Sequence, residues 1–262
     1  MTPNEQLAVV VPAYREGARI HDNLLLLLTE LDKLDRSYEV IVVSDGSPDQ
    51  TVAEVQRVAS TRVKVLEYSA NAGKGYALRS GFEASSGDPV VFIDADMELH
   101  PSSIKIFLEI MRDTGSDVVV GSKRHPDSRV LYPAFRRAQS LAYQMLVRLL
   151  FTLNVKDTQT GLKLFRREVL EQTVPLLVVK RFAFDLELLA VAHHLGFTKI
   201  EEAPINLTYR FESTTNPASV YRVLYDTLAI FYRLRILRYY DRQRARLEGG
   251  KVAKPTSDAN LE

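Results

Sequence analysis

Three acidic residues stand at alternate positions after an apolar run of the chain. Residues 90–93 are apolar, and Asp94, Asp96 and Glu98 follow them. Such a run is typical of a buried strand, and open α/β sheets bind ligands at the carboxyl ends of their strands. Alternate side chains of an extended segment point the same way, so three carboxylates can face one cation. Mg²⁺ and Mn²⁺ take oxygen ligands and leave positions for substrate phosphates. The pattern predicts a metal-diphosphate site in a transferase that uses a nucleotide-linked donor.

An isolated Asp-x-Asp is weak, because Asp is also common in turns and at helix N-termini. Companion segments strengthen the prediction. Polar residues 12–16 and 44–47 follow two earlier apolar runs, and Asn-Ala-Gly-Lys-Gly occupies 71–75 before a helical pattern. Glycines let the backbone approach a ligand, and a helix N-terminus with Lys74 favours an anion.

Alternating strands and helices must bring these segments together. We expect strands over 7–11, 38–43, 63–68, 89–93 and 117–121, with helices over 18–34, 51–59, 76–85 and 102–113. This alternation predicts βαβ units and a mostly parallel sheet of the α/β class. Neither a glycine triad nor a P-loop follows the first strand, which argues against an NAD enzyme and a P-loop NTPase.

The second half has longer helical patterns. We expect helices over 132–153, 184–195 and 218–240, a polar loop over 157–161 and a strand over 162–166. We expect a catalytic domain over 1–215, an amphipathic segment over 216–248 and a disordered tail over 249–262.

Composition excludes several classes. The chain has 262 residues, a formal net charge of +1 and no cysteine. Disulfides, thiolate metal sites and a cysteine nucleophile are therefore excluded. The charge gives no sign of nucleic-acid binding, and no RNA-binding module is visible. Without a signal-peptide pattern or a long apolar stretch, we expect a cytoplasmic protein.

The motifs, in their order and spacing, resemble inverting family 2 glycosyltransferases of the GT-A fold. More narrowly, the chain to about residue 215 is similar to polyprenyl- and dolichyl-phosphate hexose synthases. The matching segments are 12–16, 44–47, 73–75, 94–96, 121–123 and 157–161. The resemblance implies a mostly parallel central sheet flanked by helices, with C-terminal amphipathic helices.

The resemblance also implies roles for individual residues. Those on the donor side are Pro12, Tyr14, Glu16, Asp45, Lys74, Asp94, Ala95 and Arg210. Of these, Pro12, Tyr14 and Glu16 line the nucleotide pocket, Asp45 binds the base or ribose, and Lys74 lies near the nucleotide. Arg210 corresponds to an arginine near the diphosphate, although the residues after it depart from the family pattern.

Catalytic and acceptor roles follow in the same way. The resemblance places Asp157 and Gln159 beside the sugar and makes Asp94, Asp96 and Glu98 the ligands of Mg²⁺ or Mn²⁺. The residues implied for the acceptor phosphate are Lys123, Arg136 and Ser140. Asp185 and Glu187 resemble a Phe-Asp-x-Glu motif of the glucose-transferring branch, with a helix-capping Asp185 as the simpler alternative.

The expected reaction is metal-dependent, inverting transfer of a hexose from a nucleotide sugar to polyprenyl phosphate. UDP-glucose is favoured over GDP-mannose as the donor. A phosphate acceptor is already anionic near neutral pH and needs cationic side chains rather than a strong base. With a soluble or glycan hydroxyl acceptor, the first alternative, Asp157 would take the proton. A catalytically silent nucleotide-sugar-binding protein is the second alternative. A nucleotidyltransferase would need a glycine-rich basic loop after the first strand.

Arginines accompany apolar faces over 132–153 and 218–246. Basic amphipathic helices lie on anionic membrane surfaces, although the same stripes also pack cores and dimer interfaces. We therefore expect a peripheral protein on the cytoplasmic face of a membrane.

Overall fold

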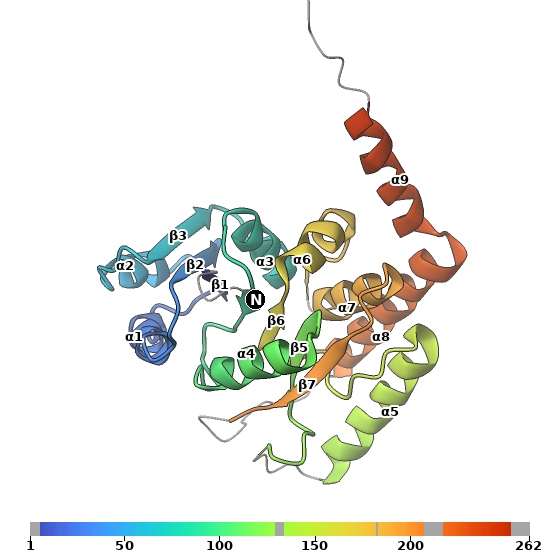
Figure 1. The fold of residues 1–262 in the computed structure, drawn as a ribbon, viewed down its shortest axis with the longest axis horizontal. Coiled ribbons are helices and arrows are strands. Elements are labelled where there is room, and N and C mark those ends of the chain that lie inside the picture. Colours follow the sequence, from blue (N-terminus) through green and yellow to red (C-terminus); the bar gives the residue numbers. More distant parts are fainter. Residues whose placement is uncertain (1–5, 129–133, 182, 207–216, 253–262) are drawn as a thin grey trace, which may run out of the picture.

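The computed structural model describes residues 6–128, 134–181, 183–206 and 217–252. Within these ranges, the side chains of 134–140, 217–220 and 250–252 are not described. Figure 1 shows a central sheet with helices on both faces and a C-terminal helix leading away from the body.

A seven-stranded sheet forms the centre of the described structure, in the order β3-β2-β1-β4-β6-β5-β7. The neighbouring strands are parallel except around β6, which is antiparallel to both β4 and β5. The predicted mostly parallel α/β sheet is confirmed, whereas hydropathy alone gives no strand direction. The strands are β1 (Leu7–Ala13), β2 (Tyr38–Asp45), β3 (Val63–Tyr68), β4 (Val90–Phe92), β5 (Val118–Ser122), β6 (Lys163–Phe165) and β7 (Ile200–Pro204).

The helices cover two apolar cores, one on each face of the sheet. Alternate residues of β1 divide between them: Val10 belongs to one core, and Val9 and Val11 to the other. This division follows from the period of two in a strand. The helical elements are α1 (Ile20–Leu31), α2 (Thr51–Gln56), α3 (Lys74–Glu83), α4 (Ser103–Thr114), α5 (Ala134–Phe151), α6 (Arg167–Thr173), η1 (Val174–Leu176), α7 (Phe184–His194), α8 (Pro217–Phe231), the π-helical η2 (Tyr232–Ile236) and α9 (Tyr239–Val252).

The C-terminal segment differs from the single helix predicted over 218–240. The α-helix α8 ends at Phe231, η2 follows, and Arg238 has a φ of 46° before α9 begins. A residue in this left-handed region ends a helix. The helix α9 continues to Val252, past the predicted start of the tail at 249, and residues 253–262 lie outside the described ranges. Ile230, Leu234 and Tyr240 are buried in the core, so this segment packs onto the body.

No helix in the described ranges is both long enough and apolar enough to cross a membrane.

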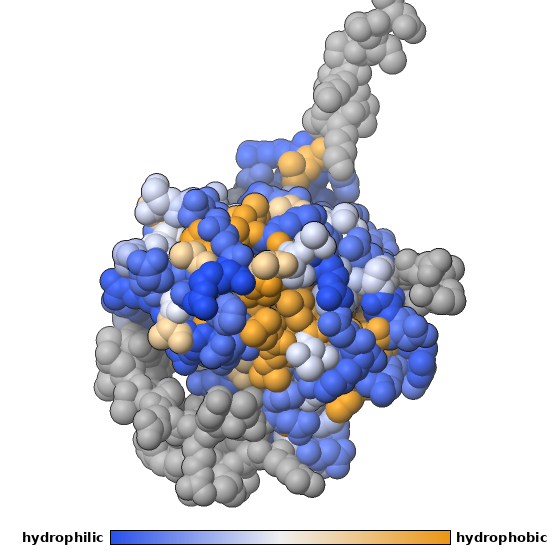
Figure 2. Space-filling model, turned by 90° about the vertical axis from the view of Figure 1, so that its left-hand side faces the viewer, coloured by the Kyte–Doolittle hydropathy of each residue, from blue (hydrophilic) through white to orange (hydrophobic). Residues whose placement is uncertain are grey.

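The β3 side of the molecule carries an apolar region. Figure 2 shows hydrophobic side chains gathered in the middle of this face with hydrophilic ones around them. A hollow of about 360 Å³ lies between α2 and β3, and its lining includes Val55, Ala59, Val63 and Val65. These lining residues take no part in the site described below.

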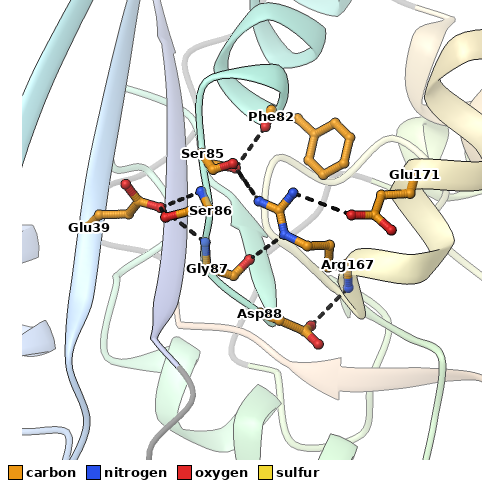
Figure 3. Close-up of polar contacts among 8 residues, drawn as sticks. All are labelled: Glu39, Phe82, Ser85, Ser86, Gly87, Asp88, Arg167 and Glu171. Carbon is orange, nitrogen blue, oxygen red and sulfur yellow. Dashed lines mark hydrogen bonds and ion pairs between the residues drawn. The ribbon is translucent and has the colours of Figure 1, made fainter. Parts of the chain in front are cut away.

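A polar clamp holds the loop that leads into β4 (Figure 3). Glu39 of β2 accepts hydrogen bonds from the N–H groups of Ser86 and Gly87 at 2.6 and 3.0 Å. Arg167 of α6 donates to the carbonyls of Gly87 and Ser85 at 3.0 and 2.6 Å. The guanidinium also lies 5.0 Å from the centre of the Phe82 ring. These contacts fix the loop before β4.

Candidate active site

The acidic motif after β4 lies in a turn. The strand ends at Phe92, Met97 has a φ of 49°, and its N–H donates to the carbonyl of Asp94 at 3.2 Å. The expectation that residues 94–98 are extended is therefore wrong. The alternation of burial persists through the turn. The acids Asp94, Asp96 and Glu98 are half-buried, and the residues between and beside them are buried, namely Ile93, Ala95, Met97 and Leu99.

Lys74, the first residue of α3, pairs with the motif. Its Nζ lies 2.5 Å from Oδ1 of Asp94. Burial opposes the charged form of Lys74, but the carboxylates of Asp94, Asp185 and Asp96 outweigh this effect and raise the pKa of the lysine. Lys74 therefore stays cationic and is suited to hold a phosphate.

The amides at the start of α3 do not form the anion site that the sequence predicts. The N–H groups of Gly75 and Tyr76 donate to the carbonyl of Lys180 at 2.9 and 3.4 Å, and the N–H of Gly73 donates to Asp45 at 2.9 Å. The anion site at this point therefore depends on the side chain of Lys74.

The three-carboxylate metal site at Asp94, Asp96 and Glu98 remains a prediction. Within the described ranges, no group of three or more His, Asp or Glu side chains is placed to hold a metal ion. Asp94 forms an ion pair with Lys74, and Oδ1 of Asp96 accepts a hydrogen bond from the N–H of Glu98 at 3.1 Å.

Two carboxylates nonetheless fit a divalent cation. Burial and then the charge of Asp96 raise the pKa of Glu98, while burial is the main cause of the raised pKa of Glu16, to which Asp96 also contributes. Negative charge thus accumulates around Asp96. Mg²⁺ commonly binds through one or two carboxylates and completes its shell with water and substrate phosphates. Asp96 and Glu98 would supply that pair.

The loop after β1 lies beside the acidic motif. Thr51 Oγ1 accepts the N–H of Glu16 at 2.9 Å, and the Glu16 carboxylate pairs with Arg19 at 2.6 Å. Pro12 is half-buried and Tyr14 is 41% exposed. The structure thus brings Glu16 to the charge of Asp96, while the nucleotide contacts implied for Pro12, Tyr14 and Glu16 remain predictions.

Asp45 at the end of β2 is engaged within the chain. Its side chain is buried, and both carboxylate oxygens accept hydrogen bonds. This arrangement holds the loop before Lys74, so direct contact of Asp45 with a base or ribose remains a prediction. The donors are Tyr68 Oη at 2.8 Å, Asn71 Nδ2 at 2.9 Å, Ala72 N at 2.7 Å and Gly73 N at 2.9 Å.

The predicted catalytic loop packs against the acidic motif. A Cβ added at Gly161 would overlap the carboxylate of Asp94, so the loop approaches this closely only because residue 161 is glycine. Oδ1 of Asp157 accepts the N–H of Gln159 at 3.3 Å, and Gln159 Nε2 donates to Tyr143 Oη at 3.5 Å. The structure thus joins this loop to β4 and to α5.

A pocket of about 210 Å³ opens beside this loop, between α5 and α8. Its lining consists of Tyr143, Gln144, Val147, residues 155–159 and Val223. Of the three residues predicted to be catalytic, Asp157 and Gln159 line this pocket between the two long helices, whereas Asp96 lies in the acidic motif.

The acceptor residues are placed less completely. Lys123 is half-buried after β5, and its charge opposes the raised pKa of Glu98, so it lies near the acidic motif. The backbone of Arg136 and Ser140 lies in α5, but their side chains are not described. Arg210 lies outside the described ranges altogether.

Sequence reasoning missed a buried ion pair next to the site. Lys163 of β6 is 1% exposed, and its Nζ lies 2.7 Å from Oδ1 of Asp185 and also donates to the Thr160 carbonyl. The residue before α7 is Ala183, so Asp185 lies inside the helix rather than at its N-cap. The signal was a lysine within the otherwise apolar run 162–165.

Comparisons with known proteins identify the family of the chain. Residues 8–174 match the profile of Glycosyl transferase family 2. The chain is 34% identical over 224 residues to a human protein named dolichyl-phosphate beta-glucosyltransferase, covering 79% of this chain and 68% of that one. The protein of the same name from Dictyostelium discoideum is 32% identical over 231 residues, covering 82% and 70%.

A solved structure shares the fold. Glucosyl-3-phosphoglycerate synthase from Mycobacterium tuberculosis, in complex with UDP, superposes with a TM-score of 0.66 at 20% identity, over 98% of this chain and 83% of that one. The same enzyme is also known with Mn²⁺, UDP-glucose and phosphoglyceric acid. The fold expected from the motifs, GT-A, is confirmed, and the chain belongs to glycosyltransferase family 2 as an enzyme of the glycosyltransferase type.

Proposed function

We propose that this enzyme transfers glucose from UDP-glucose to a polyprenyl phosphate of the dolichyl type, with inversion at the sugar and with Mg²⁺ or Mn²⁺. The names of the human and Dictyostelium relatives support both the sugar and the acceptor. The Mn²⁺ and UDP-glucose complex of the M. tuberculosis enzyme supports the donor and the metal. We further propose that residues 1–215 carry catalysis and 216–248 attach the enzyme to the cytoplasmic face of a membrane.

The observation that carries this proposal is the position of the pocket. It lies between the Asp157–Gln159 loop and two helices with exposed apolar stripes. On α5, Leu141, Met145 and Leu149 are 52%, 71% and 82% exposed at a spacing of four residues. The stripe on α8 and η2 comprises Tyr221, Tyr225, Leu228, Tyr232 and Ile236.

These stripes suit a lipid surface. The two helices are joined by a hydrogen bond between Tyr143 Oη and Thr227 Oγ1 at 3.1 Å. Large exposed apolar side chains of this number mark an interaction surface. The exposed Arg148, Arg222 and Arg235 add positive charge beside them, as expected where helices lie on anionic lipid headgroups.

The site residues then divide the chemistry. Negative charge develops on the leaving diphosphate, where Lys74 would stabilise it. Asp96 and Glu98 would hold the divalent cation, which supplies Lewis-acid stabilisation of the same charge. The acceptor phosphate is already anionic, since its second pKa is about 6. Asp157 and Gln159 would orient the sugar for attack opposite the diphosphate rather than remove a proton.

The acceptor can be tested by supplying the two candidate acceptors in separate reactions. Purified enzyme receives labelled UDP-glucose with Mg²⁺ or Mn²⁺, and either a polyprenyl phosphate in vesicles or 3-phosphoglycerate in solution. We expect glucosyl transfer only in the reaction with polyprenyl phosphate, where the label then passes into the organic phase. Label that stays in water as a glucosylated phosphoglycerate would instead support a soluble acceptor and overturn the lipid proposal.

A further inference from the structure

Glu187 is a buried carboxylate that joins two separate parts of the chain. It lies in the first turn of α7 and is 0% exposed. Oε2 accepts the N–H groups of Val178 and Val179 at 3.0 and 2.7 Å. Oε1 accepts the Tyr240 hydroxyl at 2.5 Å and Arg233 Nη2 at 3.2 Å. One side chain thus holds both the segment after η1 and the C-terminal segment.

The segment after η1, residues 177–181, contacts the start of α3. The Lys180 carbonyl accepts the N–H groups of Gly75 and Tyr76. A Cβ at Gly73, which has a φ of 102°, would come within 2.5 Å of that carbonyl oxygen. Residues 177–181 therefore pack against the backbone on both sides of Lys74.

Asp185, on the opposite side of α7, interacts electrostatically with Lys74. Residues two apart on a helix point in nearly opposite directions, since each advances about 100°. Asp185 therefore points away from Glu187, toward Lys163, and its carboxylate contributes to the raised pKa of Lys74. The first turn of α7 links the C-terminal segment on one side with the surroundings of Lys74 on the other.

We propose that Glu187 is a positioning residue for donor binding, which ties the packing of η2 and α9 to the placement of Lys74 through residues 177–181. This inference rests on the proposed nucleotide-sugar site. Because η2 continues the exposed stripe of α8, the same link would let attachment of this stripe to lipid stabilise the donor site. A discrete set of packed contacts between two sites is the physical basis of such coupling.

Two variants test the link at different strengths. Glu187→Gln keeps the shape but turns an amide toward Tyr240 or Arg233, and Tyr240→Phe removes one hydroxyl. The matched control is Glu39→Gln, another buried carboxylate that accepts two backbone N–H groups and a lysine. Glu39 lies six residues before Asp45 on β2, which places it about 20 Å from the ligand edge.

The readouts are the Kd for UDP with Mg²⁺, by calorimetry, and amide hydrogen exchange over 73–83. We expect Glu187→Gln to raise the Kd by about threefold to tenfold and to speed exchange of Gly75 and Tyr76. Tyr240→Phe should shift both in the same direction by less. Glu39→Gln should leave the Kd and the exchange rates unchanged, even if it lowers the Tm as much as Glu187→Gln does.

Failure of this inference is distinguishable from failure of the proposed function. If the wild type binds UDP and Glu187→Gln keeps the wild-type Kd and exchange, the coupling is refuted and the nucleotide site stands. An equal rise of Kd in the Glu39 control would also refute it, by showing a general loss of stability. If the wild type binds neither UDP nor GDP, the nucleotide site fails, and faster exchange over 73–76 in Glu187→Gln alone would preserve only the mechanical link.

Discussion

Individual side chains of the site were predictable by type but not by partner. The sequence indicated Lys74 from its place at a helix N-terminus and Asp94 from its place after a strand, and the family resemblance indicated Asp157. The structure brings Lys74 to Asp94 at 2.5 Å. The sequence could not indicate that Asp94 pairs with Lys74, because the turn at Met97 and the approach of α3 depend on tertiary packing. The buried pair of Lys163 and Asp185 was missed for the same reason, since the two lie 22 residues apart.

Gly161 offers a test at this scale. Gly161→Ala places a methyl group on the Asp94 carboxylate and should displace it from Lys74. We expect kcat/KM for the donor to fall by about tenfold to a hundredfold, because a misplaced site residue costs on this order. Steady-state kinetics measure this. Gly249→Ala, which meets nothing within 4 Å, is the control, and an unchanged kcat/KM in Gly161→Ala would contradict the placement of Asp94.

At the scale of elements, periodicity predicted most strands and helices, and burial explains why. The leucines of α1 that the pattern assigned to a core face, including Leu24, Leu27 and Leu31, are all buried. The antiparallel direction of β6 and the π-helical η2 were not predictable, since three-residue strands and shifted helical hydrogen bonds leave no periodic signal.

The clamp around the start of β4 makes stability depend on pH. Burial opposes ionisation of Glu39, but the N–H groups of Ser86 and Gly87, together with Lys64, outweigh it and lower its pKa. A carboxyl whose pKa is lower in the folded state stabilises the protein above its unfolded pKa, and this contribution disappears as the pH falls through the folded value.

Glu39→Gln should therefore lower the free energy of unfolding near neutral pH, by about 1–3 kcal/mol. It should also make the loss of stability below about pH 4.5 shallower than in the wild type. Denaturant unfolding at a series of pH values measures both. Parallel curves for the two proteins would show that Glu39 does not carry this dependence.

At the scale of the whole molecule, the proposed membrane-facing side consists of α5, α8 and η2. The sequence indicated basic apolar helices in both regions but not which residues remain exposed. The structure resolves this, because Val147 and Ile230 are buried whereas Leu149 and Leu228 are exposed. The polar helix α9 lacks such a stripe, which the sequence-based extension of the face to 246 did not anticipate.

Leu149→Glu should weaken binding to vesicles with anionic lipids by about tenfold, since it removes an apolar side chain that is 82% exposed and adds a like charge. Vesicle sedimentation measures the bound fraction. Leu25→Glu, at a 43% exposed position on α1, should bind as the wild type does. Equal binding of all three proteins would place the lipid contact elsewhere.

The central claim is that the edge carrying Lys74, Asp96 and Asp157 transfers a hexose from a nucleotide to a lipid phosphate. The most direct measurement is transfer to polyprenyl phosphate with UDP-glucose and GDP-mannose supplied separately, by the wild type and Asp96→Ala, with and without EDTA. We expect a lipid-extractable product from UDP-glucose that is lost in Asp96→Ala and on chelation of the metal. Product formed with GDP-mannose but not with UDP-glucose would contradict UDP-glucose as the donor. An equal amount of product from folded Asp96→Ala would contradict the role of Asp96 in the site.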